Sequence, residues 1–180
     1  SLLFFGMFVL MLYVATEQPS WPILGFLMFT GAAIGVYSIA GHVRIRVDAW
    51  LHPFSNYDQN YQIIQAQYGF AWGGLTGRGW GLGRPGLTPL ARSDMIPAAI
   101  GEELGLLGLI AITLLYAFLI MRGMKAALTS VDPYGKLLAS GLSFVVALQV
   151  FSIIGGVTRL LPLTGLTTPF MSQGGSSMMS

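Results

Sequence analysis

The sequence from Pro22 to Gly41 reads PILGFLMFTGAAIGVYSIAG and contains no charged side chain. About 20 such residues, at about 1.5 Å of helical rise each, cross the ~30 Å of hydrocarbon in a bilayer. Two further runs, Leu104 to Met121 and Leu137 to Gly156, are nearly as apolar, and Leu2 to Ala15 is a shorter one. Because 54% of the residues are hydrophobic and only 9% are charged, we expect an all-α, polytopic transmembrane helix bundle.

The ends of the chain and its composition limit the class of protein further. The chain begins at Ser1 instead of Met and closes on small residues and methionines, so we expect residues 1–180 to be one membrane domain and a fragment. It contains no cysteine, which excludes disulfides and thiolate metal sites in this stretch. His42 and His52 lack the spacing of a helical metal pair. A net charge of +2, spread over the ends of the apolar runs, gives no reason to expect a nucleic-acid partner.

The basic residues suggest an orientation in the membrane. Short connectors rich in Lys and Arg favour the cytoplasmic side, and two qualify: Arg44 to Arg46, and Arg122 to Lys136. Both lie inside only if the polar stretch from Tyr61 to Leu75 also crosses the membrane. Residues 76–103 then form a large extracellular loop. If residues 61–75 do not cross, the orientation stays ambiguous.

Three arginines fall in this expected loop: Arg78, Arg84 and Arg92. An outer loop with three arginines runs against the usual charge bias, which suggests that they serve an anion there. Guanidinium groups donate paired hydrogen bonds to phosphate oxygens, so a lipid pyrophosphate is the natural candidate. The simpler alternative is that they reach ordinary lipid phosphates. The many glycines of the loop indicate turns and close backbone approach, since no P-loop or dinucleotide fingerprint accompanies them.

Acidic and amide side chains beside the apolar runs are the other candidates for a functional site. Ionisable groups at membrane depth are functional by default, because burying them there costs several kcal/mol. Asp94 is the leading residue by this criterion. Glu102 and Glu103 follow it, with capping of a helix start as the alternative role. Gln149 stands alone in an apolar run, so we expect it to find a hydrogen-bond partner, either on a neighbouring helix or on a substrate.

The segment from Arg159 to Ser177 is too rich in Gly, Pro and hydroxyl groups to be a lipid-facing helix. Irregular backbone at membrane depth survives only where protein or water satisfies its polar groups. We therefore expect it to line a cavity or re-enter the membrane and to meet the loop that carries Asp94. Ser172 and Gln173 are its candidate substrate contacts.

Four sets of residues resemble one known family. They are Tyr61-Gln62 with Gln65, the glycines from Gly73 to Gly79, Ser93-Asp94 with Gly101-Glu102-Glu103-Leu104-Gly105, and Pro162-x-Thr164-Gly165 with Pro169-Phe170 and Gly174-Gly175-Ser176-Ser177. In order and spacing the chain is similar to the SEDS family (shape, elongation, division and sporulation) over nearly all of its length. The sequence from Pro162 to Pro169 resembles the RodA-like branch more than the FtsW-like one.

The resemblance implies a fold and an activity. It implies a ten-helix membrane protein of the bacterial cytoplasmic (inner) membrane, of which this chain is the second half. It further implies a peptidoglycan glycosyltransferase that polymerises lipid II into a growing glycan strand outside that membrane, together with a class B penicillin-binding protein. The essential acidic residue of the family falls on Asp94, so the active site is expected in the loop 76–103. The chain departs from the family pattern Thr-Asp-Phe-Ile-Phe at Ser93, Met95 and Pro97, and from a family Tyr at Gln173.

Two roles for Asp94 remain open at this stage: general base toward the acceptor hydroxyl, or ligand of a divalent cation, Mg or Mn. The three arginines would stabilise the departing pyrophosphate, although Arg92 has pairing with Asp94 as an alternative. Two other functions compete with polymerisation. A membrane protein with Gly/Pro breaks could flip lipid II across the bilayer, and a non-catalytic scaffold could recruit the penicillin-binding protein. Elongation and division roles are not distinguished by the residues.

Overall fold

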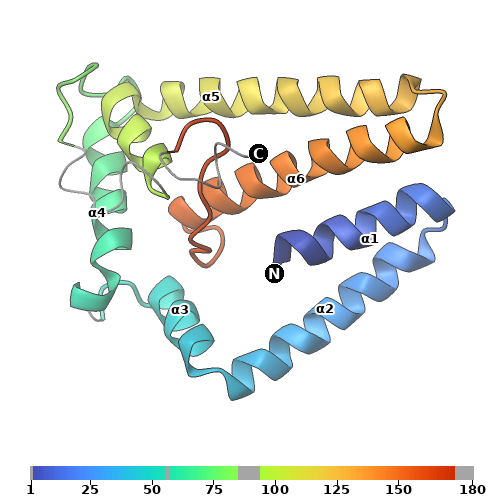
Figure 1. The fold of residues 1–180 in the computed structure, drawn as a ribbon. Coiled ribbons are helices and arrows are strands. Elements are labelled where there is room, and N and C mark those ends of the chain that lie inside the picture. The colour runs from blue at the N-terminus through green and yellow to red at the C-terminus, as the bar shows by residue number, and fades with distance from the viewer. Residues whose placement is uncertain (1, 56, 85–93, 173–180) are drawn as a thin grey trace. The chain divides into compact units, whose positions relative to one another are not determined.

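The computed structural model describes residues 2–55, 57–84 and 94–172, and within these ranges the regular structure is entirely helical. Figure 1 shows the helices in chain order: α1 (Leu2–Thr16), α2 (Ser20–Ile39), α3 (Gly41–Leu51), α4 (Tyr57–Gly73), α5 (Ile96–Thr129) and α6 (Pro133–Val157). The all-α prediction is therefore confirmed.

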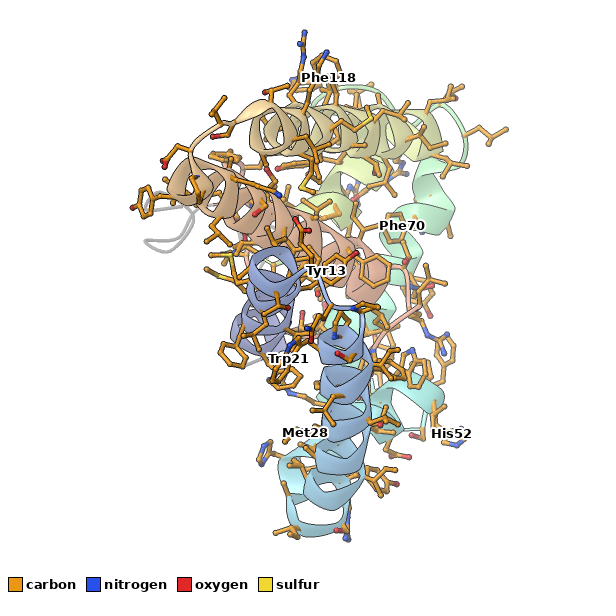
Figure 2. All side chains as sticks on the ribbon, turned by 90° about the vertical axis from the view of Figure 1, so that its right-hand side faces the viewer. Tyr13, Trp21, Met28, His52, Phe70 and Phe118 are labelled. Atoms are coloured by element: carbon orange, nitrogen blue, oxygen red, sulfur yellow. The ribbon has the colours of Figure 1, made fainter. Side chains whose placement is uncertain are left out.

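Three of the described helices are long and apolar enough to cross a membrane: α2, α5 and α6. Their large apolar side chains are widely exposed, as expected for surfaces that face lipid. Figure 2 shows two of them on α2, Trp21 and Met28, of which Met28 is 63% exposed. The predicted spans near residues 22–41, 104–121 and 137–156 are thus confirmed as helices. With 17 residues, α4 is not among these three, so its crossing of the membrane stays a prediction.

The chain divides into two compact units, and the first comprises Ser1–Arg44 and Tyr116–Leu148. In this unit α1 packs against α2 at Gly25, where a Cβ would lie 2.7 Å from a methyl carbon of Val9. The rings of Phe5 and Phe29 stack with their centroids 5.9 Å apart. This unit therefore consists of closely packed apolar helices, and it contains none of the candidate site residues.

The second unit comprises Ile45–Leu115 and Gln149–Ser180, and it carries every candidate site residue that the structure describes. Its core draws on α4, the beginning of α5 and the end of α6. The buried members are listed together here: Ala66, Met95, Ala98, Ile153 and Val157, with Phe70, Leu163 and Leu166 packed against them. Elements far apart in the sequence thus meet around the residues that precede α5.

The helix α5 begins earlier than the sequence suggested and is broken at Gly105. It begins at Ile96, so the predicted loop 76–103 gives way to helix eight residues before its expected end. Pro97 explains the early start, because its fixed φ suits the first helical turn and its missing N–H is not needed there. Gly105 has φ 69° and ψ −167°, a conformation that glycine adopts without a Cβ penalty.

The break in α5 leaves backbone groups without helical partners, and the glycine-rich segment supplies them. The N–H of Leu106 donates to the carbonyl oxygen of Gly74 (2.9 Å), and the N–H of Leu107 to that of Leu75 (3.1 Å). In return, Arg78 donates its N–H to the carbonyl oxygen of Glu102 (3.1 Å). Buried helix ends need such partners. The segment is therefore joined to both sides of the break.

After α6 the chain is irregular through Ser172, as predicted. Side chains of α3 hold it in place. The indole N–H of Trp50 donates to the carbonyl oxygen of Arg159 (2.8 Å), and Nη2 of Arg159 donates to the carbonyl oxygen of Trp50 (3.1 Å). Arg46 donates from Nη1 to the carbonyl oxygen of Leu163 (3.1 Å). These bonds satisfy carbonyl groups that no helix or sheet would satisfy.

Candidate functional site

Asp94 lies directly before α5 and is half-buried. The next residue, Met95, is 1% exposed and belongs to the core of the second unit, so it anchors the backbone at this point. Within the described part of the chain, the carboxylate of Asp94 has neither a hydrogen-bond donor nor an ion-pair partner. A partly accessible carboxylate without an internal partner is available to a substrate or a proton.

The carboxylate of Asp94 faces the irregular segment after α6. A Cβ built on Gly165 would lie 3.7 Å from Oδ2 of Asp94, in ordinary van der Waals contact. Gly165 has φ 68°, which favours glycine at this position. The prediction that the segment after Arg159 meets the region of Asp94 is confirmed by this contact.

A pocket of about 380 Å³ opens beside the beginning of α5. One wall is a face of α4, with the spacing i, i+3, i+4, i+7 that places side chains on the same side of a helix. The rest is formed by the glycine-rich segment and by Glu102. Its lining consists of Gln65, Tyr68, Gly69, Trp72, Arg78, Arg84 and Glu102. Asp94 is not part of this lining, so the described site has two separate parts.

Glu102 organises the polar side of the pocket. It is 6% exposed, and its Oε1 accepts a hydrogen bond from the backbone N–H of Arg84 (2.9 Å) and one from Nη1 of Arg78 (3.5 Å). A buried carboxylate is stable only when such donors replace water. Glu102 was expected at the start of a helix, but α5 begins at Ile96, so the predicted capping of a helix start is wrong.

Arg78 and Arg84 differ in how they are held. The Cζ of Arg78 lies 4.2 Å from the ring centroid of Trp72, a cation–π contact that adds to its ion pair with Glu102. Arg84 is exposed, and its guanidinium forms no ion pair with any described residue. The pocket lining therefore holds two guanidinium groups against one carboxylate, an excess of positive charge that suits an anion.

The remaining predicted residues lie elsewhere or outside the description. Glu103 is half-buried beside Gly83, where a Cβ would lie 2.7 Å from its Cγ. Ser172 is 6% exposed and donates its hydroxyl hydrogen to the carbonyl oxygen of Thr168 (2.8 Å). Arg92 and Gln173 fall outside the described residues. The structure therefore joins Arg78, Arg84 and Glu102 but leaves Ser172 outside the pocket lining.

Gln149 departs from expectation. It lies at the end of α6 that belongs to the second unit, and its Oε1 is buried without a hydrogen-bond partner among the described residues. The described helices thus give this oxygen no partner, and the alternative of a substrate contact stays a prediction.

Sequence reasoning missed the α4 wall of the pocket. Gln65 was noted for the family resemblance, and neither it nor Trp72 was among the candidate site residues. The signal that identifies them is the helical spacing of Gln65, Tyr68, Gly69 and Trp72. This pattern places an amide, a phenol and an indole on the same face as the glycine-rich segment that follows.

The described residues do not form a cation site of their own. No three His, Cys, Asp or Glu side chains gather within residues 2–55, 57–84 and 94–172. Mg²⁺ binds through one or two carboxylates together with phosphate oxygens and water. A cation at Asp94 would therefore depend on oxygens of a bound substrate, and the prediction of Mg or Mn stays a prediction.

Comparison with known proteins gives a consistent picture. Residues 1–180 match the model of the FtsW/RodA/SpoVE family, described as "Cell cycle protein". The chain is 50% identical over 181 residues to the peptidoglycan glycosyltransferase RodA of Mycobacterium tuberculosis, covering 100% of this chain and 39% of that protein. It is 38% identical to the probable peptidoglycan glycosyltransferase FtsW of Geobacter metallireducens, covering 97% of this chain and 47% of that protein.

One solved structure is similar in fold. It is described as "Structural coordination of polymerization and crosslinking by a peptidoglycan synthase complex", and the match has a TM-score of 0.76 at 25% identity. It covers 98% of this chain and 49% of the solved chain. The chain thus spans from 39% to 49% of the length of these three proteins.

Proposed function

The chain belongs to the FtsW/RodA/SpoVE family, and on that premise we propose that it is part of a peptidoglycan glycosyltransferase that polymerises lipid II. Its membrane-spanning helices and its family make it a multi-pass protein of the bacterial cytoplasmic membrane. RodA of Mycobacterium tuberculosis, which is 50% identical to this chain, is named a peptidoglycan glycosyltransferase. The higher identity to RodA than to FtsW relatives supports a RodA-like member.

The observation that carries the proposal is the carboxylate of Asp94, half-buried and without a partner among the described residues. In the proposed reaction an acceptor sugar hydroxyl attacks the anomeric carbon of the lipid-linked donor. The new bond joins that oxygen to the anomeric carbon, and the bond from this carbon to the pyrophosphate oxygen breaks. Asp94 accepts the hydroxyl proton and passes it to water, while undecaprenyl pyrophosphate leaves.

The leaving pyrophosphate carries negative charge that the protein must stabilise. Arg84 supports this role because it lines the pocket, is exposed and has no ion-pair partner among the described residues. Arg78 supports it because it is held in place by Glu102 and Trp72. Fixed guanidinium groups stabilise a departing phosphate without reorganising during the reaction. Arg92, Glu103, Ser172 and Gln173 remain proposed substrate contacts, and Gln149 is a further one through its unpaired oxygen.

A divalent cation at Asp94 is a separate proposal. Asp94 and pyrophosphate oxygens together would supply the oxygen ligands that Mg²⁺ and Mn²⁺ prefer. When bound, such a cation neutralises phosphate charge. Proton transfer to Asp94 does not depend on it.

A class B penicillin-binding protein is the proposed protein partner, with lipid II and the growing glycan strand as the ligands. The support is the similarity in fold to a chain of a peptidoglycan synthase complex. The present chain covers 49% of that solved chain, so the partner is proposed for the whole protein.

The test uses the full-length protein and its penicillin-binding partner, purified in detergent, with the transpeptidase blocked. Lipid II is added without any membrane, and glycan strands are separated by length. Polymer formation supports the glycosyltransferase, because neither flipping nor scaffolding forms a glycosidic bond. Absence of polymer, under conditions in which a control polymerase is active, contradicts it.

A further inference from the structure

The α4 wall of the pocket carries two exposed aromatic side chains whose position differs from that of a lipid-facing aromatic. Trp72 is 61% exposed and Tyr68 is 45% exposed. Both line the pocket with Gln65 on the same helical face. Lipid-facing side chains have apolar neighbours, whereas these two share the pocket with guanidinium and carboxylate groups. Their setting indicates a ligand that has both apolar and polar sides.

The orientation of Trp72 is fixed by charged neighbours. Arg78 lies over its ring at 4.2 Å, and Arg78 is itself 3.5 Å from the carboxylate of Glu102. The side chain of Glu102 is only 8% exposed and that of Arg78 is 31% exposed, so the more buried residue anchors the more exposed one. Glu102 thereby sets the position of both Arg78 and the indole.

Glu102 also fixes the course of the glycine-rich segment. Its Oε1 accepts the backbone N–H of Arg84 at 2.9 Å, which brings residue 84 to the pocket. Arg84 is a lining residue of the same pocket, and its exposed side chain forms no ion pair with a described residue. One buried carboxylate therefore positions an aromatic platform and a cationic group at the same cavity.

We propose that this pocket binds a phosphate-linked sugar, with the sugar ring against Trp72 and Tyr68, the phosphate at Arg84, and Glu102 as the positioning residue. The proposal rests on the proposed function and assigns the sugar-recognising wall to α4. The C–H face of a pyranose ring packs against an aromatic ring, while its hydroxyl groups need donors and acceptors. The amide of Gln65 and the phenol of Tyr68 supply these.

The size and charge of the pocket agree with such a ligand. About 380 Å³ lies within the ~300–1,000 Å³ range of small-ligand sites and accommodates one sugar ring with its phosphate. The head group of an ordinary phospholipid also carries a phosphate, but it has no sugar ring to pack against the aromatic and amide side chains of α4. Phospholipid binding is therefore the competing outcome.

The probe is lipid II with a shortened polyprenyl chain, and the protein is the full-length chain with its partner in nanodiscs of phosphatidylcholine. Asp94→Asn is present in every sample to prevent turnover. Trp72→Ala and Glu102→Ala are each expected to raise the Kd about tenfold. Trp80→Ala is the matched control, because Trp80 is 82% exposed on the same segment and does not line the pocket. Its Kd is expected to be unchanged.

Two conservative variants keep the result interpretable if an alanine variant folds poorly. Trp72→Phe keeps an aromatic platform and is expected to bind within about twofold of the reference. Glu102→Gln keeps an acceptor for the N–H of Arg84 but loses the charge that faces Arg78, so an intermediate Kd is expected. Unchanged binding by folded Trp72→Ala overturns the proposal.

A second arm separates the two sources of phosphate. Phosphatidylglycerol is added to the nanodiscs in increasing proportion, and the Kd for the lipid II probe is measured again. Little competition supports a sugar-specific pocket. Equal competition through the pocket identifies a phospholipid site and overturns the sugar assignment. If binding depends on the pocket but the wild type forms no polymer, the proposed function fails and the pocket assignment stands. If the wild type forms polymer but Trp72→Ala binds lipid II as the reference does, the pocket assignment fails and the proposed function stands.

Discussion

Oε1 of Glu102 and Nη1 of Arg78 lie 3.5 Å apart, and they join residues 24 positions apart in the sequence. The carboxylate is almost fully buried, whereas the guanidinium is 31% exposed. A buried carboxylate loses its hydration and needs donors from the protein. The pair therefore ties the glycine-rich segment after α4 to the first part of α5, next to Asp94.

This pair should be measurable as a coupling in stability. Glu102→Ala and Arg78→Ala are each expected to lower the thermal stability of the purified full-length protein. The double variant should lose about 1 kcal/mol less free energy of unfolding than the two single variants lose together. A hydrogen bond between charged groups can contribute more than this, but solvent partly screens Arg78. Glu103→Gln serves as the control, because Glu103 forms no ion pair with a described residue. Strict additivity of the two single variants would contradict the pairing.

Close packing at Gly73 gives a second prediction. A Cβ at this position would overlap the carbonyl oxygen of Gly101. Gly73→Ala is therefore expected to destabilise the protein by about 1–3 kcal/mol, the usual cost of overpacking. Gly31→Ala is the matched control, since Gly31 is also helical and no described atom lies within 4 Å of its Cβ position.

The control at Gly31 should be neutral or slightly stabilising, because alanine favours the helix over glycine. Thermal unfolding of both variants in the same detergent checks the difference. A Gly73→Ala protein as stable as Gly31→Ala would mean that α4 and α5 do not approach each other as closely as described.

Much of the helical architecture could be predicted from the sequence, because membrane spans follow from apolar length alone. The runs near residues 22–41 and 137–156 became α2 and α6 with small shifts. The irregular backbone after α6 was predictable from its Gly and Pro content. The early start of α5 was not recognised, although Pro97 signals it, and the break at Gly105 depends on partners such as Gly74 that only the folded chain brings near.

The site was predicted less completely, because it depends on contacts between distant residues. The candidate list contained Arg78, Arg84 and Glu102, but no pattern in the sequence pairs Arg78 with Glu102. The α4 wall was accessible from the helical spacing of Tyr68 and Trp72. The unpaired oxygen of Gln149 could not be foreseen, since polar groups in apolar runs usually find partners.

Arg46 should affect catalysis without touching the substrate pocket. Its guanidinium donates to the carbonyl oxygen of Leu163, two residues before the glycine that faces Asp94. Arg46→Ala is expected to lower kcat for polymerisation about tenfold with little change in KM, because a small displacement near a reacting group is costly. Arg44→Ala is the control, since among the described residues Arg44 donates to the carbonyl oxygens of Tyr37 and Ser38 at the end of α2 and not to the segment after α6. A pure change in KM would argue against this positioning role.

Arg84 should show the opposite pattern. If its guanidinium contacts the pyrophosphate of bound lipid II, Arg84→Ala is expected to raise KM about tenfold. Arg84→Lys should recover part of the loss, because an ammonium keeps the charge but not the paired donors. Steady-state polymerisation kinetics at fixed ionic strength provide the measurement. Identical KM values for Ala and wild type would remove Arg84 from the binding site.

The most direct measurement compares wild type, Asp94→Asn and Asp48→Asn in glycan-strand synthesis by the full-length protein with its penicillin-binding partner and the transpeptidase blocked. Asn keeps the size of the side chain but cannot accept the proton, and Asp48 is an exposed carboxylate on α3 of the same unit. Equal amounts of folded complex are confirmed first. We predict at least a 100-fold loss of polymer for Asp94→Asn, on the order of a general base's contribution, and wild-type synthesis for Asp48→Asn. Polymer from Asp94→Asn at the wild-type rate would contradict a catalytic role for Asp94.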